Sequence, residues 1–193
     1  VVNGYLELVG VEGHVSRRRE ATARLADVHA QLETRFGLTP TPDTETLLAT
    51  LPTDPMPVHA VLARVRLDIA EERYEQALRH LARHGGLQRV ADMETLRGLA
   101  MARAGRVAEA REHFSKARQL DPRHVRSRLE LGHLLVTLGD HEALQHLNDI
   151  LQRLSREHPE ALMLRAEYAI NAQENLAQAR SDLERLQGPM RGQ

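Results

Sequence analysis

The chain has 193 residues, a formal net charge of −1 and 27% charged residues, so overall charge gives no reason to expect binding to DNA, RNA or a membrane surface. Cysteine is absent, which excludes disulfides, thiolate zinc sites and cysteine nucleophiles. Aromatic residues make up 3% and none is tryptophan, so we expect no stacking surface for single-stranded nucleic acid. We find neither a secretory signal nor an apolar run long enough to span a bilayer, and we expect a cytoplasmic protein.

The first part of the chain predicts two helices separated by glycines. Tyr5–Val9 indicates a helix that is cut short and closed by Gly10 and Gly13. A long helix is expected from about Ser16, with an apolar stripe of four residues: Leu25, Val28, Leu32 and Phe36.

Proline and glycine divide the next stretch. Gly37 ends the long helix, and Asp43 or Thr44 is expected to cap a short helix that carries three leucines, Leu47, Leu48 and Leu51. Three prolines at 52, 55 and 57 exclude a helix there. We therefore predict a segment 1–52, a linker 53–57, a helical array 58–187 and a tail 188–193.

The segment Leu96–Pro122 predicts a complete helix–turn–helix. Apolar residues recur at helical spacing on both sides of Gly105, which supplies the positive φ that commonly ends a helix. Pro122 ends the second helix, because proline lacks a backbone N–H and restricts the residue before it. The same pattern recurs nearby, since Ala77, Ala110 and Ala143 are evenly spaced (110 − 77 = 33 and 143 − 110 = 33).

This period and these residues resemble the tetratricopeptide repeat (TPR) family over about 57–186. Six positions of the best copy fit the family pattern: Gly98, Gly105, Ala110, Phe114, Ala117 and Pro122. The resemblance implies an all-α fold, a right-handed superhelical array of antiparallel helix pairs. The earlier copy has Glu71-Glu72-Arg73 in place of a turn glycine, and the copy ending at Pro159 predicts a second helix about three residues too long.

The run from Glu20 to Leu51 resembles the end of the bacterial transcriptional activator domain found in Streptomyces antibiotic regulatory proteins. The resemblance is carried by Glu20-Ala21, Leu25, Phe36-Gly37-Leu38, Pro40, Pro42-Asp43-Thr44 and Leu47-Leu48. It implies a DNA-binding domain ahead of Val1, so any contact with DNA is expected through a domain that is not in this chain.

Catalytic and metal motifs are weak. His141 and His146 lie five residues apart, whereas two zinc ligands on one helix face require a spacing of four. His80 and His84 have that spacing, but no third ligand lies nearby in sequence. We therefore expect no catalytic residue, no metal and no cofactor, and a chain that is not an enzyme.

Surface recognition remains as the expected role. The resemblance implies a concave groove lined by the first helices of successive repeats, and helical spacing assigns it Arg66, Leu99, Arg103, Arg126, Leu129 and His133. Arginines between apolar positions could take an acidic peptide of a protein partner. One alternative is a small-molecule-sensing domain with a ligand near Pro52–His59. The other is a free-standing adaptor that self-associates as a homodimer. Because the outer face of the last helix is polar, we expect such a homodimer to form through the N-terminal end.

Overall fold

The computed structural model describes residues 2–36, 43–53, 56–84 and 90–187, and every regular element within those ranges is a helix. The chain forms two compact units, Val1–Ala104 and Gly105–Gln193. The predicted linker at 53–57 falls inside the first unit, and the predicted tail 188–193 lies outside the described residues.

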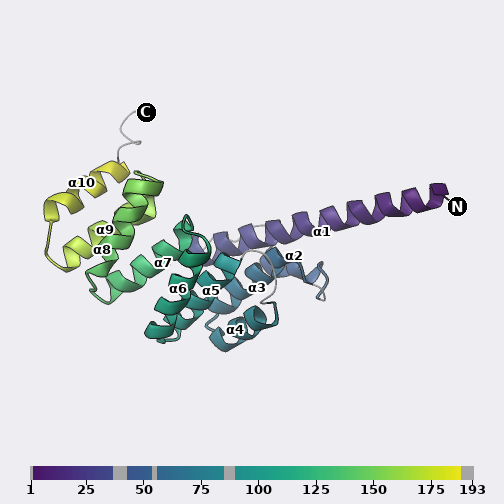
Figure 1. Ribbon diagram of the computed structural model, residues 1–193, viewed down its shortest axis with the longest axis horizontal. Helices are drawn as coiled ribbons and strands as arrows, with labels where there is room; N and C mark the ends of the chain where they lie inside the picture. Colours follow the sequence, from purple (N-terminus) through teal and green to yellow (C-terminus); the bar gives the residue numbers. More distant parts are fainter. Residues whose placement is uncertain (1, 37–42, 54–55, 85–89, 188–193) are drawn as a thin grey trace. The chain divides into compact units, whose positions relative to one another are not determined.

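The first unit, called unit 1, consists of five helices: α1 (Val2–Phe36), α2 (Thr44–Ala49), α3 (Val58–Ala70), α4 (Tyr74–Arg83) and α5 (Val90–Arg103). Both α1 and α2 pack against α3, and α5 packs against α3 and α4. The N-terminal part of α1 extends beyond the other helices of the unit (Figure 1).

The prediction of two helices before Gly37 is wrong, because α1 is one continuous helix from Val2 to Phe36. Gly10 and Gly13 lie inside it and do not end it. Glycine costs a helix interior only about 1 kcal/mol relative to alanine. The segment contains no proline, which would remove a backbone hydrogen bond, so nothing in it forces a break.

The buried face of α1 also differs from the predicted stripe. Leu25 and Val28 are 43% and 52% exposed, whereas Ala23, Ala26 and Ala30 are fully buried. These alanines form one core cluster with residues of α2, α3 and the turn that follows α2: Leu47, Leu48, Leu51, Ala60, Ala63 and Leu67. Small side chains let two long helices approach closely, which larger leucine and valine side chains would prevent. The expected cap is confirmed, since the Thr46 N–H donates to Asp43 Oδ1 at 2.7 Å.

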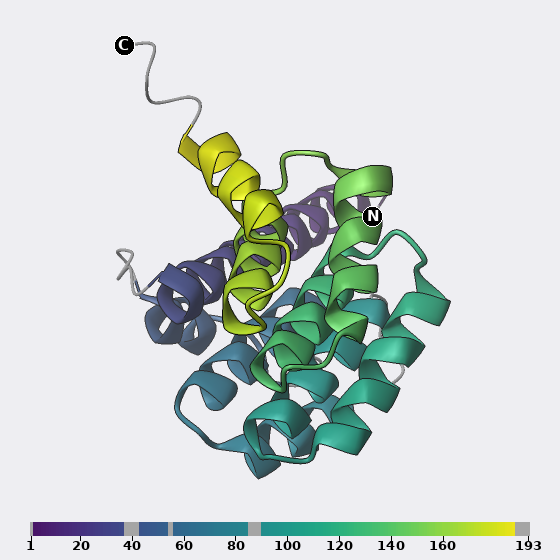
Figure 2. The same cartoon turned by 90° about the vertical axis from the view of Figure 1, so that its left-hand side faces the viewer.

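The second unit, called unit 2, contains α6 (Val107–Leu120), α7 (Val125–Thr137), α8 (Glu142–Asp149), a π-helical turn η1 (Ile150–Leu154), α9 (Pro159–Asn171) and α10 (Leu176–Gln187). Consecutive helices pack together, and α9 contacts both α7 and α8 (Figure 2). Unit 2 therefore contains α6 and two antiparallel helix pairs, α7 with α8 and α9 with α10. The first helix of the second pair, α9, packs against both helices of the first.

Four turns repeat the same backbone geometry. Glu72, Gly105, Gly139 and Gln173 all have positive φ, at 61°, 77°, 67° and 55°. They follow one another at nearly equal intervals along the chain (105 − 72 = 33, 139 − 105 = 34 and 173 − 139 = 34). In three of these turns the next N–H donates to the carbonyl oxygen five residues back: Arg73 to Asp68, Asp140 to Leu135, and Glu174 to Ala169. This is the Schellman arrangement that closes a helix. The predicted all-α array of antiparallel helix pairs is confirmed within each unit.

The helix before Pro159 is not too long. Together α8 and η1 span 142–154, no more than α6 spans. Pro159 is the first residue of α9, where a missing N–H is tolerated, whereas Pro122 lies in the loop after α6. Ala179 of α10 is equivalent to Ala143 of α8 but follows it by 36 residues (179 − 143 = 36) instead of 33. The additional residues lie mainly in the turn before α10, where Asn175 is a second residue with positive φ, at 50°.

Candidate functional site: a polar pocket in unit 2

The six residues predicted to line a groove are divided between the two units. Unit 1 holds Arg66 on α3 and Leu99 and Arg103 on α5, and unit 2 holds Arg126, Leu129 and His133 on α7. A single groove through all six therefore stays a prediction.

Two of the predicted arginines are engaged within the chain. Arg66 Nε lies 3.0 Å from Asp27 Oδ1, and the two side chains are 14% and 6% exposed. Arg126 pairs with Glu130 on its own helix and with Glu160 on α9, at 3.4 Å. Both arginines connect neighbouring helices, α1 to α3 and α7 to α9. Their charges are therefore already compensated.

The remaining predicted residues differ in exposure. Leu129 is 3% exposed and belongs to the interior of unit 2. Leu99 is half-buried and packs against the core of unit 1. Only Arg103 and His133 are exposed. Of the predicted set, these two are thus the side chains that a partner could reach directly.

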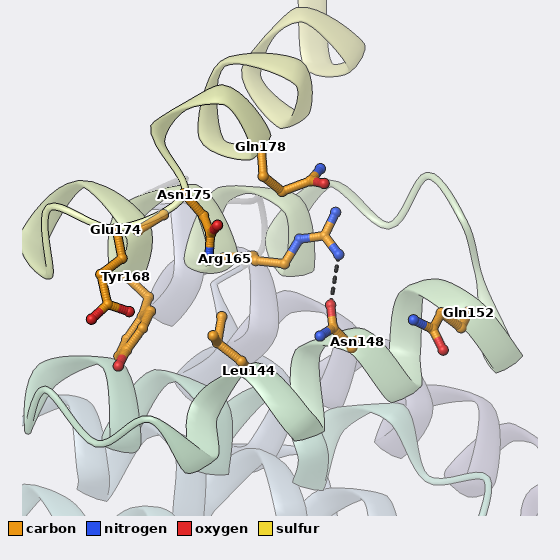
Figure 3. A pocket seen from close by; sticks show the side chains of 9 residues that line it. Leu144, Asn148, Gln152, Arg165, Tyr168, Glu174, Asn175 and Gln178 are labelled. Atoms are coloured by element: carbon orange, nitrogen blue, oxygen red, sulfur yellow. Dashed lines mark hydrogen bonds between the residues drawn. The ribbon is translucent and has the colours of Figure 1, made fainter.

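A pocket of about 360 Å³ lies in unit 2 between α8, α9 and α10 (Figure 3). Leu144, Tyr168 and Ala169 supply its apolar wall. The polar lining comes from α8 and η1 on one side, α9 in the middle, and α10 with the turn before it on the other: Asn148, Gln152, Arg165, Glu174, Asn175 and Gln178.

An ion pair fixes the centre of this pocket. Arg165 Nε and Nη2 each donate to Asp182, both at 2.7 Å, in the bidentate geometry that guanidinium and carboxylate favour. Asp182 is fully buried and also accepts from Gln178 Nε2 at 2.9 Å. Arg165 Nη1 donates to Asn148 Oδ1 at 2.6 Å, the dashed line in Figure 3. The network ties α8, α9 and α10 together.

The Arg165–Asp182 pair leaves no uncompensated charge at the centre of the pocket, and the rest of the polar lining consists of amides and the Glu174 carboxylate. Asp182 compensates Arg165, and the carbonyl oxygen of the Asn148 side chain is occupied, so its NH₂ group is what it can offer a ligand. Gln152 and Asn175 carry exposed amides. A carboxamide donates and accepts hydrogen bonds, as a peptide bond does, so this lining suits a peptide backbone better than an isolated charge.

Tyr168 gives the apolar wall a fixed position. Its side chain is 5% exposed, and its ring meets the His141 ring edge-on, with centroids 6.3 Å apart and planes at 79°. Edge-to-face packing is a favoured arrangement for aromatic rings. The pocket could not be predicted from the sequence, because its lining comes from four helical elements and one turn and no short motif joins them.

No binding site for a metal emerges within the described ranges, where no group of three or more His, Asp or Glu side chains could hold an ion. His80 Nε2 lies 3.7 Å from the buried Asp68, which accounts for one member of the His80 and His84 pair. Among the described helices, none combines the length and the apolar character needed to cross a membrane.

The fold defines a helical-repeat protein, an architecture that commonly presents binding surfaces to other proteins. Residues 101–168 match the family model of the tetratricopeptide repeat, which confirms the predicted resemblance for that stretch. No curated protein and no solved structure matches the chain significantly.

Proposed function

We propose that the chain is a non-catalytic module that binds a protein partner, and that a peptide segment of the partner occupies the pocket of unit 2. The observation that carries the proposal is the amide-rich lining above an apolar wall, with the one central charge compensated by Asp182. Side-chain amides can pair with the backbone of an extended segment, and Leu144 and Tyr168 can pack against one of its apolar side chains.

The test removes two of the exposed amides and leaves Gln178, which donates to Asp182, in place. Gln152→Ala truncates one amide, and Asn175→Gly truncates the other while preserving the positive φ of 50°. The matched control is Gln145→Ala with Gln173→Gly, which likewise removes one helical amide and one amide at a residue with positive φ, both exposed and outside the pocket.

Partners are captured from the source cells with immobilised chain, identified by mass spectrometry, and reduced to a binding peptide. We expect the pocket variant to bind that peptide at least about tenfold more weakly, because two hydrogen bonds of roughly 1 kcal/mol each are lost. The control variant should bind like the unchanged chain. Equal binding by both variants would remove the pocket from the proposal.

We further propose that the module is the effector or assembly arm of a larger bacterial transcriptional regulator. The support is the resemblance carried by the segment from Glu20 to Leu48, including Pro42-Asp43-Thr44. An immunoblot of the source cells with an antibody to this chain tests it. A band much larger than 21.7 kDa is expected, and a band at that mass would contradict the proposal.

A small-molecule-sensing role is the second candidate, and the pocket volume favours it. About 360 Å³ lies within the 300–1,000 Å³ typical of ligand pockets. The pocket lies in unit 2 rather than near Pro52–His59, where the sequence suggested a ligand. Thermal unfolding with a panel of metabolites distinguishes this role, since a ligand at 100 times its Kd adds about 2.7 kcal/mol. A metabolite that stabilises the chain and displaces no peptide would favour sensing.

Self-association is the third candidate, and exposed apolar residues on the last helix pair favour it. Met163 and Ile170 on α9 are 57% and 51% exposed, and Leu176 on α10 is 56% exposed. Met163→Asp with Ile170→Asp should abolish any dimer seen by sedimentation velocity. A dimer that persists in this variant would place the interface elsewhere.

A further inference from the structure

Two arginines of unit 2 carry buried N–H groups without an acceptor. Within the described residues, Nε of Arg118 on α6 and both Nε and Nη1 of Arg128 on α7 are buried and make no hydrogen bond. Several other arginines of the unit are paired with carboxylates: Arg111, Arg126, Arg165 and Arg180. A buried donor without a partner is unfavourable, and a charged donor more so.

These arginines belong to one cluster. Helix α7 packs against both α6 and η1, and η1 carries Arg153. Burial lowers the pKa of the Arg128 guanidinium, and the nearby positive charges of Arg118 and Arg153 lower it further, while Asp149 and Asp121 raise it. Counting Arg128 itself, the charges in this set are three arginines and two aspartates, an excess of one positive charge. Asp149 is in turn engaged by Arg153, at 3.5 Å.

His146 on α8 borders the same cluster. Its ring is 3% exposed, and burial lowers its pKa, followed in size by the effect of Arg118. Neither ring nitrogen has a hydrogen-bond partner, and Nε2 lies 3.6 Å from Glu142 Oε1. A neutral imidazole adds no positive charge to the cluster. The excess charge therefore belongs to the arginines, two of which carry the unpaired N–H groups.

We propose that Arg118 and Arg128 form a binding site for a carboxylate, and that this carboxylate is an Asp, Glu or C-terminal group of the peptide that the module binds. The proposal rests on the proposed protein-binding function. One excess positive charge matches one carboxylate, whereas a phosphate dianion would leave a net negative site. Guanidinium N–H groups bind carboxylates with short, charge-assisted hydrogen bonds.

The site lies close in the chain to the pocket described above. Gln152 lines the pocket and Arg153 belongs to the arginine cluster, and the two are neighbours on η1. A bound segment that passes η1 can therefore place its backbone at the amides and an acidic side chain at the arginines. This explains how a pocket with a neutral centre can belong to a module that selects an acidic peptide.

The experiment observes the unpaired groups directly. Nitrogen-15 NMR of the arginine Nε–H groups in the full chain is followed during titration with acetylated tetraglutamate amide, with sodium acetate and with inorganic phosphate. The signals of Arg118 and Arg128 are assigned from their loss in Arg118→Gln and Arg128→Gln. We expect the tetraglutamate peptide to shift both signals in a saturable manner, and each variant to raise its Kd at least about tenfold.

Arg123→Gln is the matched control, because Arg123 is exposed in the loop between α6 and α7. It should leave the affinity unchanged. The proposal is overturned if the peptide shifts neither signal, if phosphate alone does so, or if Arg123→Gln weakens binding as much as Arg128→Gln.

Thermal unfolding without any probe separates binding from a structural role. Arg128→Gln replaces a half-buried guanidinium whose Nε and Nη1 have no hydrogen-bond acceptor, so its Tm should equal or exceed that of the unchanged chain. A Tm several degrees lower would show that the arginine supports the fold and would overturn the proposal. The pocket variant Gln152→Ala with Asn175→Gly should bind tetraglutamate normally while losing its partner, so the two proposals fail separately.

Discussion

The repeated left-handed turn residue allows a quantitative test at Gly105. Its φ is +77°, and a Cβ built there would meet no atom within 4 Å, so Gly105→Ala introduces backbone strain without a steric clash. A non-glycine residue in the left-handed region costs about 1–2 kcal/mol. The reduced freedom of the unfolded chain returns about 0.4–1 kcal/mol. We therefore expect a net loss of about 1 kcal/mol in the free energy of unfolding.

The reverse change is available one repeat earlier. Glu72 adopts φ +61° at the equivalent turn, and its side chain is exposed. Glu72→Gly should therefore raise the free energy of unfolding by about 0.5–1 kcal/mol, since it relieves strain of the same origin. Glu112→Gly provides the control, because Glu112 is exposed in the interior of α6, where glycine should cost about 1 kcal/mol.

Urea unfolding followed by circular dichroism at neutral pH measures all three variants through their midpoints. The same Glu→Gly substitution is thus predicted to have opposite signs at 72 and at 112. If Glu72→Gly destabilises the chain as much as Glu112→Gly does, the turn geometry inferred for the copy without a turn glycine is wrong.

Three further variants test packing, the buried ion pair and pH dependence. Gly132→Ala should lower the free energy of unfolding by about 1 kcal/mol despite the better helix propensity of alanine, because its Cβ would meet Leu147 Cδ2 at 3.0 Å; an unchanged urea midpoint would contradict this. Asp182→Ala should cost about 3–5 kcal/mol in the same assay, since it leaves Arg165 buried without its carboxylate, and a smaller effect than that of Gly132→Ala would refute the pairing. Burial lowers the pKa of His146 below its usual 6.5, so the unfolded chain takes up a proton at a higher pH than the folded chain does. The free energy of unfolding should therefore fall as the pH drops below about 6.5. Urea midpoints measured between pH 7.5 and 5 should fall less in His146→Leu than in the unchanged chain.

The repeat could be predicted from the sequence because its signals are local. Helical periodicity and Gly105 indicate where the two helices of one pair meet, and Gly105 has the expected positive φ, which Gly139 shares. The turns at Glu72 and Gln173 have the same geometry without glycine. There the packing of the two helices holds the backbone in a conformation that the residue type alone would not predict.

The buried face of α1 could not be predicted from hydrophobicity. Counting apolar residues favours Leu25 and Val28, yet alanines at 23, 26 and 30 face α3 in the core. Which stripe of a helix is buried depends on how closely the neighbouring helix approaches. That distance depends on the residues of the neighbouring helix, which lie far away in the sequence. The local periodicity of α1 therefore does not indicate it.

Arginine partners are also set by tertiary contacts. Arg66 pairs with Asp27, 39 residues away, and Arg126 reaches Glu160, 34 residues away. Helical spacing correctly placed both arginines on the first helices of pairs but could not show that a carboxylate of another helix already engages them. Arg118 and Arg128, whose buried N–H groups lack such partners, have no sequence feature that distinguishes them.

The pocket occurs where the last pair departs from the pattern of the earlier ones. The second helices carry His80, His113 and His146 at equal intervals (113 − 80 = 146 − 113), but the position equivalent to His146 in α10 is Asp182. On the first helices, Arg165 of α9 occupies the place that Leu131 has in α7. The ion pair between Arg165 and Asp182 thus stands where the earlier pair has a leucine and a histidine. Arg165 also donates a hydrogen bond to Asn148, and Asp182 accepts one from Gln178. The regular repeat positions supply the packing between helices. Two neighbouring positions that change together, as these do, can therefore take part in recognition without loss of that packing. Binding sites in helical repeats should be sought where two such positions differ together from the repeat pattern.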